Sequence, residues 1–517
     1  MNTARLLYHL ARADFLERAR RYSFLIMLGL VVFLGYQAAV GNLSVQVGNY
    51  RGEYNSAWVG SMMALIASFF LGWLGFYLVK GSVGRDRATG VGQIMAATPL
   101  KRPLYTFGKW LSNFAVLLSM LVILAIVGVA IQVFAAESEG IELGALLAPF
   151  VFIALPMLAL TSAMAVLFET IGFLSGGFGN VIYFFLFLML FPVFGETLSE
   201  TNPAIEPVGF ALLERSMGAA AAVAYPGYDG GFTLGSTDAP ILGIFQWSGI
   251  AWTSDILLRR LLIFGIGVAV SLLASVFFDR FDSTRTPRRM KKALSPAKPE
   301  MVPVKAATAQ AVRLTPLVAT HGSTFVRILI SELKLLLKGQ RWWWYLVAAG
   351  LMIASLAGKA QDVRAFVLPI AWLWPVLIWS GMGSREVLHN TQQMVFSSAA
   401  PLRRQLPGSW LAGFLVAVVA GSGAALKLLS AGDGAGLLAW GSAALFIPSL
   451  ALVLGVWSNG RKLFEVLYIS LWYLAMNKLA AVDFLGASSD GNVSFFIPAS
   501  ILLIAFAFIG RARQLQN

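Results

Sequence analysis

The feature that most constrains this chain is a succession of apolar runs, each about 20 residues long, that recurs from one end to the other. A bilayer core requires about 20 apolar residues per helix, and its backbone polar groups must be paired internally. Of the 517 residues, 58% are hydrophobic and 12% are charged, whereas a soluble domain carries about 25% charged residues. The sequence therefore predicts an all-α polytopic membrane protein.

The apolar runs predict twelve spans, six on each side of a basic, proline-rich stretch. The first six are expected at 22–41, 57–79, 107–135, 145–168, 179–198 and 259–278, and the second six at 342–357, 364–383, 409–430, 434–457, 463–482 and 494–510. Between them lie Arg285, Arg288, Arg289, Lys291 and Lys292 among prolines. We expect a first six-span half at 1–282, a cytoplasmic basic linker at 283–322 and a second six-span half at 323–517.

The positions of lysine and arginine predict the orientation. With the N-terminus in the cytoplasm, most of the 39 basic residues fall on the cytoplasmic side, as the positive-inside rule requires. Both termini and the linker are then cytoplasmic. The net charge of +14 is explained in this way without a nucleic-acid partner. The chain has no cysteine, which excludes disulfides and thiolate metal sites.

The two halves resemble each other in the polar stretch between their second and third spans. GRDRATGVGQIMAATPLKRPLYTFGKWL in the first half matches GSREVLHNTQQMVFSSAAPLRRQLPGSWL in the second, with a small gap. Arg85-Asp86 aligns with Arg385-Glu386, and Trp110 aligns with Trp410. Six spans per half give both halves one orientation, so the sequence predicts a parallel repeat about an axis along the membrane normal.

Each half also opens with a charged segment of helical character. The segment before the seventh span is amphipathic: one face carries Phe325, Leu329, Leu333 and Leu336, and another carries Arg327, Ser331, Lys334, Lys338 and Arg341. Residues 3–21 follow the same pattern less regularly. We expect both segments to lie in the membrane interface.

The polar stretches themselves are too long for simple turns. In the first, Val91, Ile94 and Met95 form an apolar face at helical spacing, and Pro99 ends the helix. Lys101 and Arg102 hold that end at the inner surface. A short helix presented twice about one axis suits docking to a paired partner. A re-entrant or surface helix that only sets topology is an equally weighted alternative.

No catalytic constellation is present in the sequence. It contains no HExxH, GxSxG or P-loop motif, and Gly108-Lys109 is followed by Trp110 where a P-loop needs Ser or Thr. We therefore expect no enzyme activity, no catalytic residue, no metal and no cofactor in this chain. The spans carry neutral polar groups rather than the charges of ion-coupled carriers. Candidate substrate-pathway residues are Ser68, Asn180, Tyr183, Ser380, Tyr473 and Asn477, although such residues more often hold helices together.

The first polar stretch resembles that of the membrane subunits of type-2 ABC exporters. The residues that carry the resemblance are Arg85, Asp86, Gly90, Thr98, Pro99, Leu100, Arg102, Gly108 and Lys109. The second half carries Glu386, Pro401, Leu402, Arg403 and Arg404. It departs from the pattern at Gln392, where a glycine is expected, and at Gly408-Ser409, where glycine-lysine is expected.

The resemblance implies a role for each part of the chain. The opening segments would be elbow helices, and residues 86–100 and 386–402 would be coupling helices, each seated on one of two cytoplasmic ATPase subunits that bind ATP and Mg. The implied docking residues are Asp86, Thr89, Gly90, Ile94, Met95, Thr98, Pro99, Leu100, Glu386, Thr391, Met394, Pro401 and Leu402. The chain would then be a fused two-half permease of a bacterial inner membrane.

Other functions remain open at this stage. A membrane scaffold or sensor that recruits cytoplasmic partners would use the same helices, and an ion-coupled carrier is disfavoured by the uncharged spans. The loop at 199–258 is long compared with its counterpart at 483–493. It is interpreted as an outer gate, a docking surface for an external partner or, slightly preferred, a folded cap.

Overall fold

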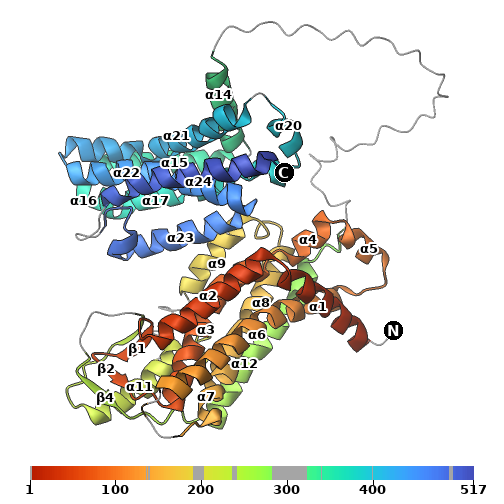
Figure 1. Ribbon diagram of the computed structural model, residues 1–517, viewed down its shortest axis with the longest axis vertical. Helices are drawn as coiled ribbons and strands as arrows, with labels where there is room; N and C mark the ends of the chain where they lie inside the picture. The colour runs from red at the N-terminus through yellow and green to blue at the C-terminus, as the bar shows by residue number, and fades with distance from the viewer. Residues whose placement is uncertain are drawn as a thin grey trace, which may run out of the picture. The chain divides into compact units, whose positions relative to one another are not determined.

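The computed structural model describes residues 3–135, 137, 140–189, 203–235, 241–281, 323–338, 340–398, 400–487 and 493–516. The chain divides into two compact units, Met1–Thr286 and Pro287–Asn517. Both units are mostly helical (Figure 1). The predicted linker at 283–322, with its basic residues, lies outside the described residues.

The described part of the first unit contains helices of different lengths and four short strands. In chain order its elements are α1 (Thr3–Ala19), α2 (Tyr22–Ala39), β1 (Ser44–Val47), β2 (Tyr50–Gly52), α3 (Ser56–Val79), α4 (Ser82–Ala88), α5 (Val91–Ala97), α6 (Arg102–Ala135), α7 (Leu143–Pro149), the π-helix η1 (Phe150–Ala154), α8 (Leu155–Thr170), α9 (Gly177–Met189), the 3-10 helix η2 (Pro203–Ile205), α11 (Phe210–Ala224), β3 (Phe232–Gly235), β4 (Gly243–Phe245) and α12 (Ser254–Phe277).

The described part of the second unit is helical throughout. In chain order its elements are α14 (Thr324–Leu337), α15 (Trp342–Ala357), α16 (Ala360–Asp362), the π-helix η4 (Val363–Val367), α17 (Leu368–Leu373), α18 (Val376–Trp379), α19 (Arg385–Leu388), α20 (Gln392–Phe396), α21 (Pro401–Ser430), α22 (Gly434–Ser458), α23 (Lys462–Met476), the 3-10 helices η5 (Ala480–Val482) and η6 (Val493–Phe495), and α24 (Phe496–Gln516).

Eight helical stretches in the described residues are long and apolar enough to cross a membrane. They are Tyr22–Ala39, Ser56–Ala88, Arg102–Phe134, Leu143–Thr170, Ser254–Phe277, Pro401–Ser430, Gly434–Ser458 and Val493–Gln516. The expected multi-pass helical architecture is confirmed, but the count of twelve spans is not. Helices α9, α15 and α23 are shorter, and the run at 364–383 is broken because Pro375 separates α17 from α18.

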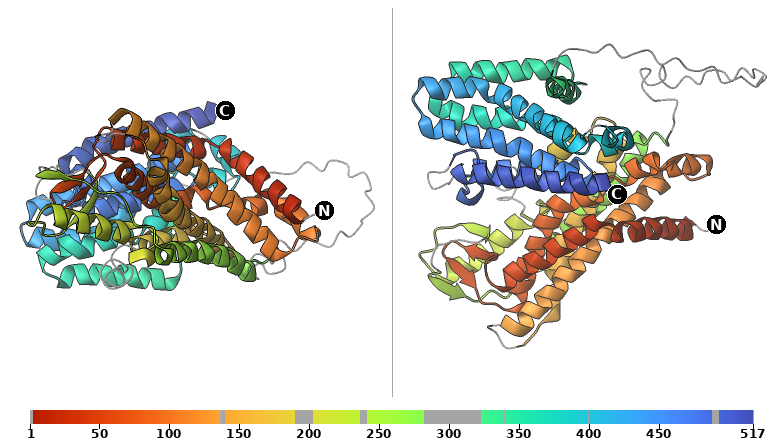
Figure 2. Two further views of the ribbon diagram at one scale, coloured as in Figure 1. Left: turned by 90° about the horizontal axis from the view of Figure 1, so that it is seen from below. Right: turned by 45° about the horizontal axis from the view of Figure 1, so that its top comes forward.

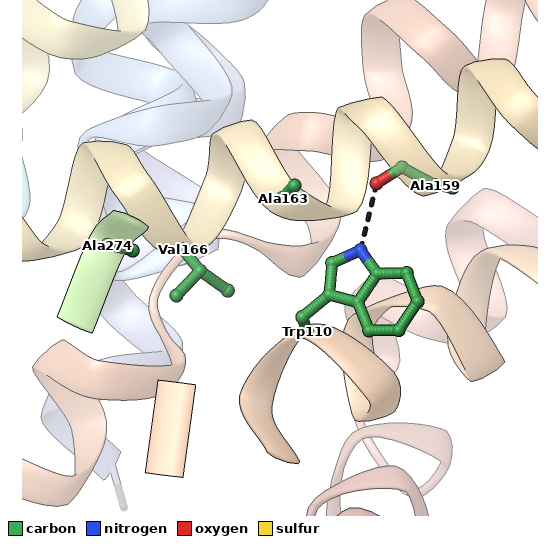
Figure 3. Packing of buried hydrophobic residues seen from close by; sticks show 5 residues of the cluster. All are labelled: Trp110, Ala159, Ala163, Val166 and Ala274. Atoms are coloured by element: carbon green, nitrogen blue, oxygen red, sulfur yellow. Dashed lines mark hydrogen bonds between the residues drawn. The ribbon is translucent and has the colours of Figure 1, made fainter. Parts of the chain in front are cut away.

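Small residues let the helices of the first unit approach closely. Trp110 of α6 donates from Nε1 to the carbonyl oxygen of Ala159 in α8, at 3.0 Å, and packs with Ala163, Val166 and Ala274 (Figure 3). A Cβ on Gly267 of α12 would lie 2.9 Å from the carbonyl carbon of Ala159. In lipid the hydrophobic effect does not drive helices together. Small residues at the contact let the two backbones approach closely, and van der Waals packing then stabilises the pair.

The four strands form one sheet, in the order β3-β1-β2-β4. Strand β1 is antiparallel to β2 and β3, and β2 is parallel to β4. Tyr50 of β2 stacks on Tyr225 with ring centroids 4.2 Å apart. The two views agree that the sheet and α11 lie at one end of the unit's long helices and α1, α4 and α5 at the other (Figures 1 and 2).

This sheet adds short strands to the predicted helical fold, and two of them, β3 and β4, come from the long loop at 199–258. The described part of that loop contains η2, α11, β3 and β4, so it is folded, as the cap, the outer gate and the docking surface would each require. Strands of 3 and 4 residues show too little alternation to be recognised. Their pairing partners, Ser44–Val47 and Phe232–Gly235, are also far apart in the sequence.

The two opening helices occupy corresponding places in their units. Helix α1 packs against α6, and α14 packs against α21. Each contact is made at a glycine: a Cβ on Gly108 would clash with Leu10, and one on Gly408 would lie 3.1 Å from Cγ2 of Ile328. The close approach explains why a glycine stands near the start of both α6 and α21.

Candidate functional site: two helix corners

The first corner, residues 82–100, consists of two short helices rather than the single helix predicted at 86–100. Helix α4 ends at Ala88, and Gly90 has a left-handed φ of 77° that turns the chain into α5. Helix α5 ends at Ala97, and Thr98 is extended, with ψ 159°. Proline disfavours helical backbone in the residue before it, so Pro99 explains this end.

A buried ionic network holds the first corner to α1 and α6. Oδ2 of Asp86 lies 2.6 Å from Nζ of Lys109 and accepts a hydrogen bond from the hydroxyl of Tyr105 at 2.8 Å. Nζ of Lys109 also lies 2.6 Å from Oδ2 of Asp14 on α1. Arg85 pairs with Asp14 at 3.2 Å and with Glu17. A fully buried ammonium is thus shared by two carboxylates, which compensates its loss of hydration.

Glu169, at the end of α8, anchors the start of α4. Its carboxylate accepts hydrogen bonds from four consecutive backbone N–H groups, those of Gly81, Ser82, Val83 and Gly84, at 2.5, 3.0, 2.6 and 3.1 Å. The first N–H groups of a helix have no partner within the helix and attract negative charge. The sequence analysis assigned no role to Glu169. The signal was its acidic side chain next to an apolar run, where a charge requires a partner.

The other side of the corner rests on aromatic packing. Val83, Tyr105 and Phe278 are buried together, and Met95 and Leu100 pack against them. Ile94 remains 69% exposed. The corner therefore presents an apolar side chain to its surroundings while its base is fixed within the unit.

The second corner, residues 385–402, is held by different groups. The carboxylate of Glu386 accepts from Nε2 of Gln405 and lies 3.4 Å from Nη2 of Arg511 on α24. The same Nη2 donates to the carbonyl oxygen of Gly383 at 3.2 Å, and the guanidinium lies 4.9 Å from the ring centroid of Phe396. Arg385 pairs with Glu332 of α14 at 2.7 Å, as Arg85 pairs with Asp14.

The acidic groups of the second corner have shifted pKa values. Burial raises the pKa of Glu386, but the Arg511 charge and hydrogen bonds that include the one from Gln405 outweigh burial and leave it below its ordinary value. Burial raises the pKa of Glu332, and the charge of Arg385 only partly offsets this. The pKa values of these two carboxylates are therefore shifted in opposite directions.

The turn of the second corner falls at Asn390, whose φ of 54° is left-handed like that of Gly90. The prediction that Gln392 stands in the glycine's place was therefore wrong, because the alignment gap had been placed too early. Asparagine is among the non-glycine residues that tolerate left-handed backbone best. The departure at Ser409 stands: it is buried and carries no charge where Lys109 does.

The structure separates the predicted docking residues by exposure. Exposed side chains are Thr89, Ile94, Thr98, Pro99 and Met394; half-buried residues are Gly90, Met95, Leu100, Thr391, Pro401 and Leu402. Asp86 and Glu386 are buried and directed at partners within their own units. These two carboxylates therefore position the corners rather than form their outer surface.

Two of the six candidate substrate-pathway residues, Asn180 and Tyr183, bond to another helix of the first unit. Asn180 accepts from Nζ of Lys80 at 2.7 Å, and Tyr183 donates to the carbonyl oxygen of Gly72 at 2.6 Å. Ser68 and Ser380 are buried, Tyr473 is half-buried, and Asn477 is exposed and donates to the carbonyl oxygen of Tyr473. These contacts favour the packing interpretation. Within the described ranges, no group of three His, Asp or Glu residues could hold a metal ion.

Residues 8–207 match the family model described as ABC-2 family transporter protein. The matched segment starts in α1, contains the whole first corner and Glu169, and ends before α11. No curated protein matches the chain.

Proposed function

We propose that this multi-pass membrane protein is the permease subunit of an ATP-driven exporter, on the basis that residues 8–207 match the family model described as ABC-2 family transporter protein. Separate ATPase subunits dock on its two corners. ATP binding there favours one arrangement of the permease because the ATPases contact its states differently. Substrate then moves by alternating access.

The observation that supports this proposal most strongly is the construction of the first corner. A short helix presents Ile94, 69% exposed, while Asp86, Lys109 and Glu169 fix its base to α1, α6 and α8. Because the base is rigid, a displacement of α5 is transmitted to the spans. A flexible loop in the same place would change its own conformation and leave the spans where they are. The family match covers this corner.

The second unit supports a fused, two-half permease. Arg385, Glu386 and Trp410 stand where Arg85, Asp86 and Trp110 stand in the first unit, and Arg385 and Arg85 each pair with an acid of their opening helix. Trp410 stacks on Phe414 with ring centroids 5.6 Å apart, and Trp110 stacks on Phe114 at the same distance. We therefore propose one copy of this chain with two ATPase subunits. The chain itself carries out no ATP chemistry, and ATP and Mg bind to the ATPases.

The sheet supports six crossings in the first half. Because β2 and β3 belong to one sheet, an even number of crossings must separate them. Helices α3, α6 and α8 provide three. We assign the fourth to α9, whose described part is 13 residues long. The N-terminus and the first corner are then on the side of the membrane opposite the sheet. By the positive-inside rule we place the side of the N-terminus in the cytoplasm of a bacterium.

The proposal is tested by coupling measurements on Ile94. The permease is purified with the ATPase that accompanies it from native membranes and reconstituted in proteoliposomes. Ile94→Asp places a charge in the proposed interface and should abolish most ATPase association, because a desolvated, unpaired charge is costly. Ile94→Leu keeps an apolar side chain and should retain it. Met394→Asp and Met394→Leu repeat the comparison on the second corner.

Two outcomes decide between exporter and scaffold. Loss of ATPase association and of ATP-dependent transport in Ile94→Asp, with normal membrane insertion, supports the exporter. Association of no ATP-hydrolysing protein with the wild-type chain contradicts the exporter and favours a scaffold or sensor that recruits other partners.

A further inference from the structure

A small cavity lies in the first unit where α1 meets α2. Figure 1 shows α1, α2 and α6 side by side within this unit. The cavity is lined by the end of α1, the starts of α2 and α4, the end of α3 and Val116 of α6. Its described lining includes Arg18, Arg21, Lys80 and Arg85 but no acid.

Arg18 is the unusual member of this group. The side chain is only 6% exposed, and Nη1 donates to Oδ1 of Asn113 at 2.5 Å. Nη2 is buried without a hydrogen-bond partner in the part of the chain that the structure describes, and no described carboxylate lies within 4.0 Å of the guanidinium. Burial lowers the pKa of Arg18. A buried cation with an unused donor indicates a missing anion.

The neighbouring acids are already engaged by other cations. Glu17 pairs with both Arg21 and Arg85, and Asp14 pairs with Arg85 and Lys109. Neither forms an ion pair with Arg18. The charges of Asp14, Glu169 and Glu17 act on Arg18 without forming an ion pair with it, so its unused Nη2 donor is available to an anion from outside the described protein.

The remaining walls indicate the source of that anion. Phe24, Leu78 and Val79 are apolar, and they lie where the apolar helix α2 has just begun, at Tyr22. Cationic groups beside an apolar wall at the start of a span lie at the depth of lipid headgroups. We propose that this cavity binds the phosphate of an anionic membrane phospholipid, with Arg18 and Arg21 as its charged ligands and the apolar wall against its glycerol and acyl region.

The test compares lipid with free phosphate in the purified full chain. Thermal unfolding is followed in nanodiscs of phosphatidylcholine alone, of phosphatidylcholine with increasing phosphatidylglycerol, and of phosphatidylcholine with inorganic phosphate in the buffer. Wild-type protein should gain stability with phosphatidylglycerol and not with inorganic phosphate. In Arg18→Gln, the phosphatidylglycerol fraction that gives half the effect should rise at least about tenfold, the loss expected for one charge-assisted hydrogen bond.

Arg20→Gln is the matched control, since Arg20 is exposed beside the cavity and the same charge is removed. It should keep the wild-type response. If Arg18→Gln does not fold, Arg21→Gln removes a charge from the cavity rim, at a side chain that is 47% exposed, and should show the same direction of change. Equal effects of Arg18→Gln and Arg20→Gln, or full protection by inorganic phosphate, would overturn the proposal. No ATPase takes part, so the result is independent of the proposed transport.

Discussion

The two corners share a shape but differ in the origin of the cation that holds them. In the first, Lys109 comes from α6, the helix that directly follows the corner, and lies 2.6 Å from both Asp86 and Asp14. In the second, Ser409 takes the lysine's place, and Arg511 comes from α24 near the end of the chain, 3.4 Å from Glu386. One geometry is therefore maintained by two different sets of contacts.

The different contacts determine which helices each corner is expected to move with. The first is tied to its opening helix, its third span and, through Glu169, the end of α8. The second is tied to α14 through Arg385 and to α24 through Arg511. A displacement at α5 is expected to travel into α1, α6 and α8, whereas one at α20 is expected to travel into α24.

The largest expected difference comes from removing the buried carboxylates. Asp86→Ala leaves the ammonium of Lys109 buried with one partner fewer and should destabilise the first unit by about 3–5 kcal/mol. Glu386→Ala should cost less, because Arg511 keeps hydrogen bonds to Gly383 and Gln514. Thermal unfolding of each variant in detergent, with limited proteolysis to locate the unfolded unit, measures both losses.

A double substitution is the control for that prediction. Asp86→Ala combined with Lys109→Met removes both charges and should recover part of the loss, because apolar groups of similar size replace a buried pair at little cost. Asp14 keeps its contact with Arg85 in this variant. Equal losses of stability for Asp86→Ala and Glu386→Ala would contradict the expectation that the contacts of Asp86 contribute more stability than those of Glu386.

The next effect concerns how each corner begins. Glu169→Gln keeps the size of the side chain but removes the charge that binds the N–H groups of Gly81 to Gly84, and should cost about 1–3 kcal/mol. Helix α19 has no side-chain cap at Ser384, whose buried hydroxyl has no partner in the described structure. Ser384→Ala should therefore be close to neutral. Urea titration of both variants in detergent checks the contrast, and a large loss in Ser384→Ala would refute it.

A smaller effect concerns the turn residues. A Cβ on Gly90 would meet nothing within 4 Å, so Gly90→Ala should cost only the backbone strain of a left-handed residue, about 1–2 kcal/mol. Asn390→Gly should be neutral or slightly stabilising, since asparagine already accepts this conformation. Hydrogen exchange of the corner amides reports both changes. Protection that falls as much in Asn390→Gly as in Gly90→Ala would show that the turns are not equivalent.

The smallest effect is a pH response specific to the second unit. The pKa of Glu332 is raised, so its contribution to stability is present below its unfolded pKa and is lost as pH rises through the folded value. Glu332→Gln should therefore reduce the loss of thermal stability between about pH 4 and pH 7. Glu386→Gln should act in the opposite sense, because the lowered pKa of Glu386 contributes stability that is lost as pH falls. Unfolding temperatures measured in detergent from about pH 3 to pH 7 test both signs, because the Glu386 contribution is lost below the ordinary glutamate pKa of about 4.3 and the Glu332 contribution above it.

The sequence was most informative where local patterns decide the structure. The positions of the eight long apolar helices and the helix end before Pro99 follow from hydropathy and backbone chemistry. Contacts between distant segments were less accessible. Nothing near Glu169 in the sequence shows that its partners are the N–H groups of residues 81–84, and nothing near Glu386 identifies Arg511.

The same limit applies to the candidate site residues. The family resemblance implied docking roles for Asp86 and Glu386. The structure buries both, since each has a cation available from another helix. Asn180 and Tyr183 were candidates for a substrate pathway, but their polar atoms are used by Lys80 and Gly72. Which polar group faces a partner depends on the tertiary arrangement, which periodicity does not contain.

The four-stranded sheet has a consequence for biosynthesis. The hairpin of β1 and β2 is made early, but the strands that cover its two edges, Phe232–Gly235 and Gly243–Phe245, are translated only after several helices have followed. Until those strands reach the same side of the membrane, both hairpin edges offer unpaired backbone groups to other chains. The first unit thus cannot complete its assembly helix by helix in order of synthesis. A chain whose translation stops before residue 232 keeps unpaired strand edges, which chaperones or proteases can recognise.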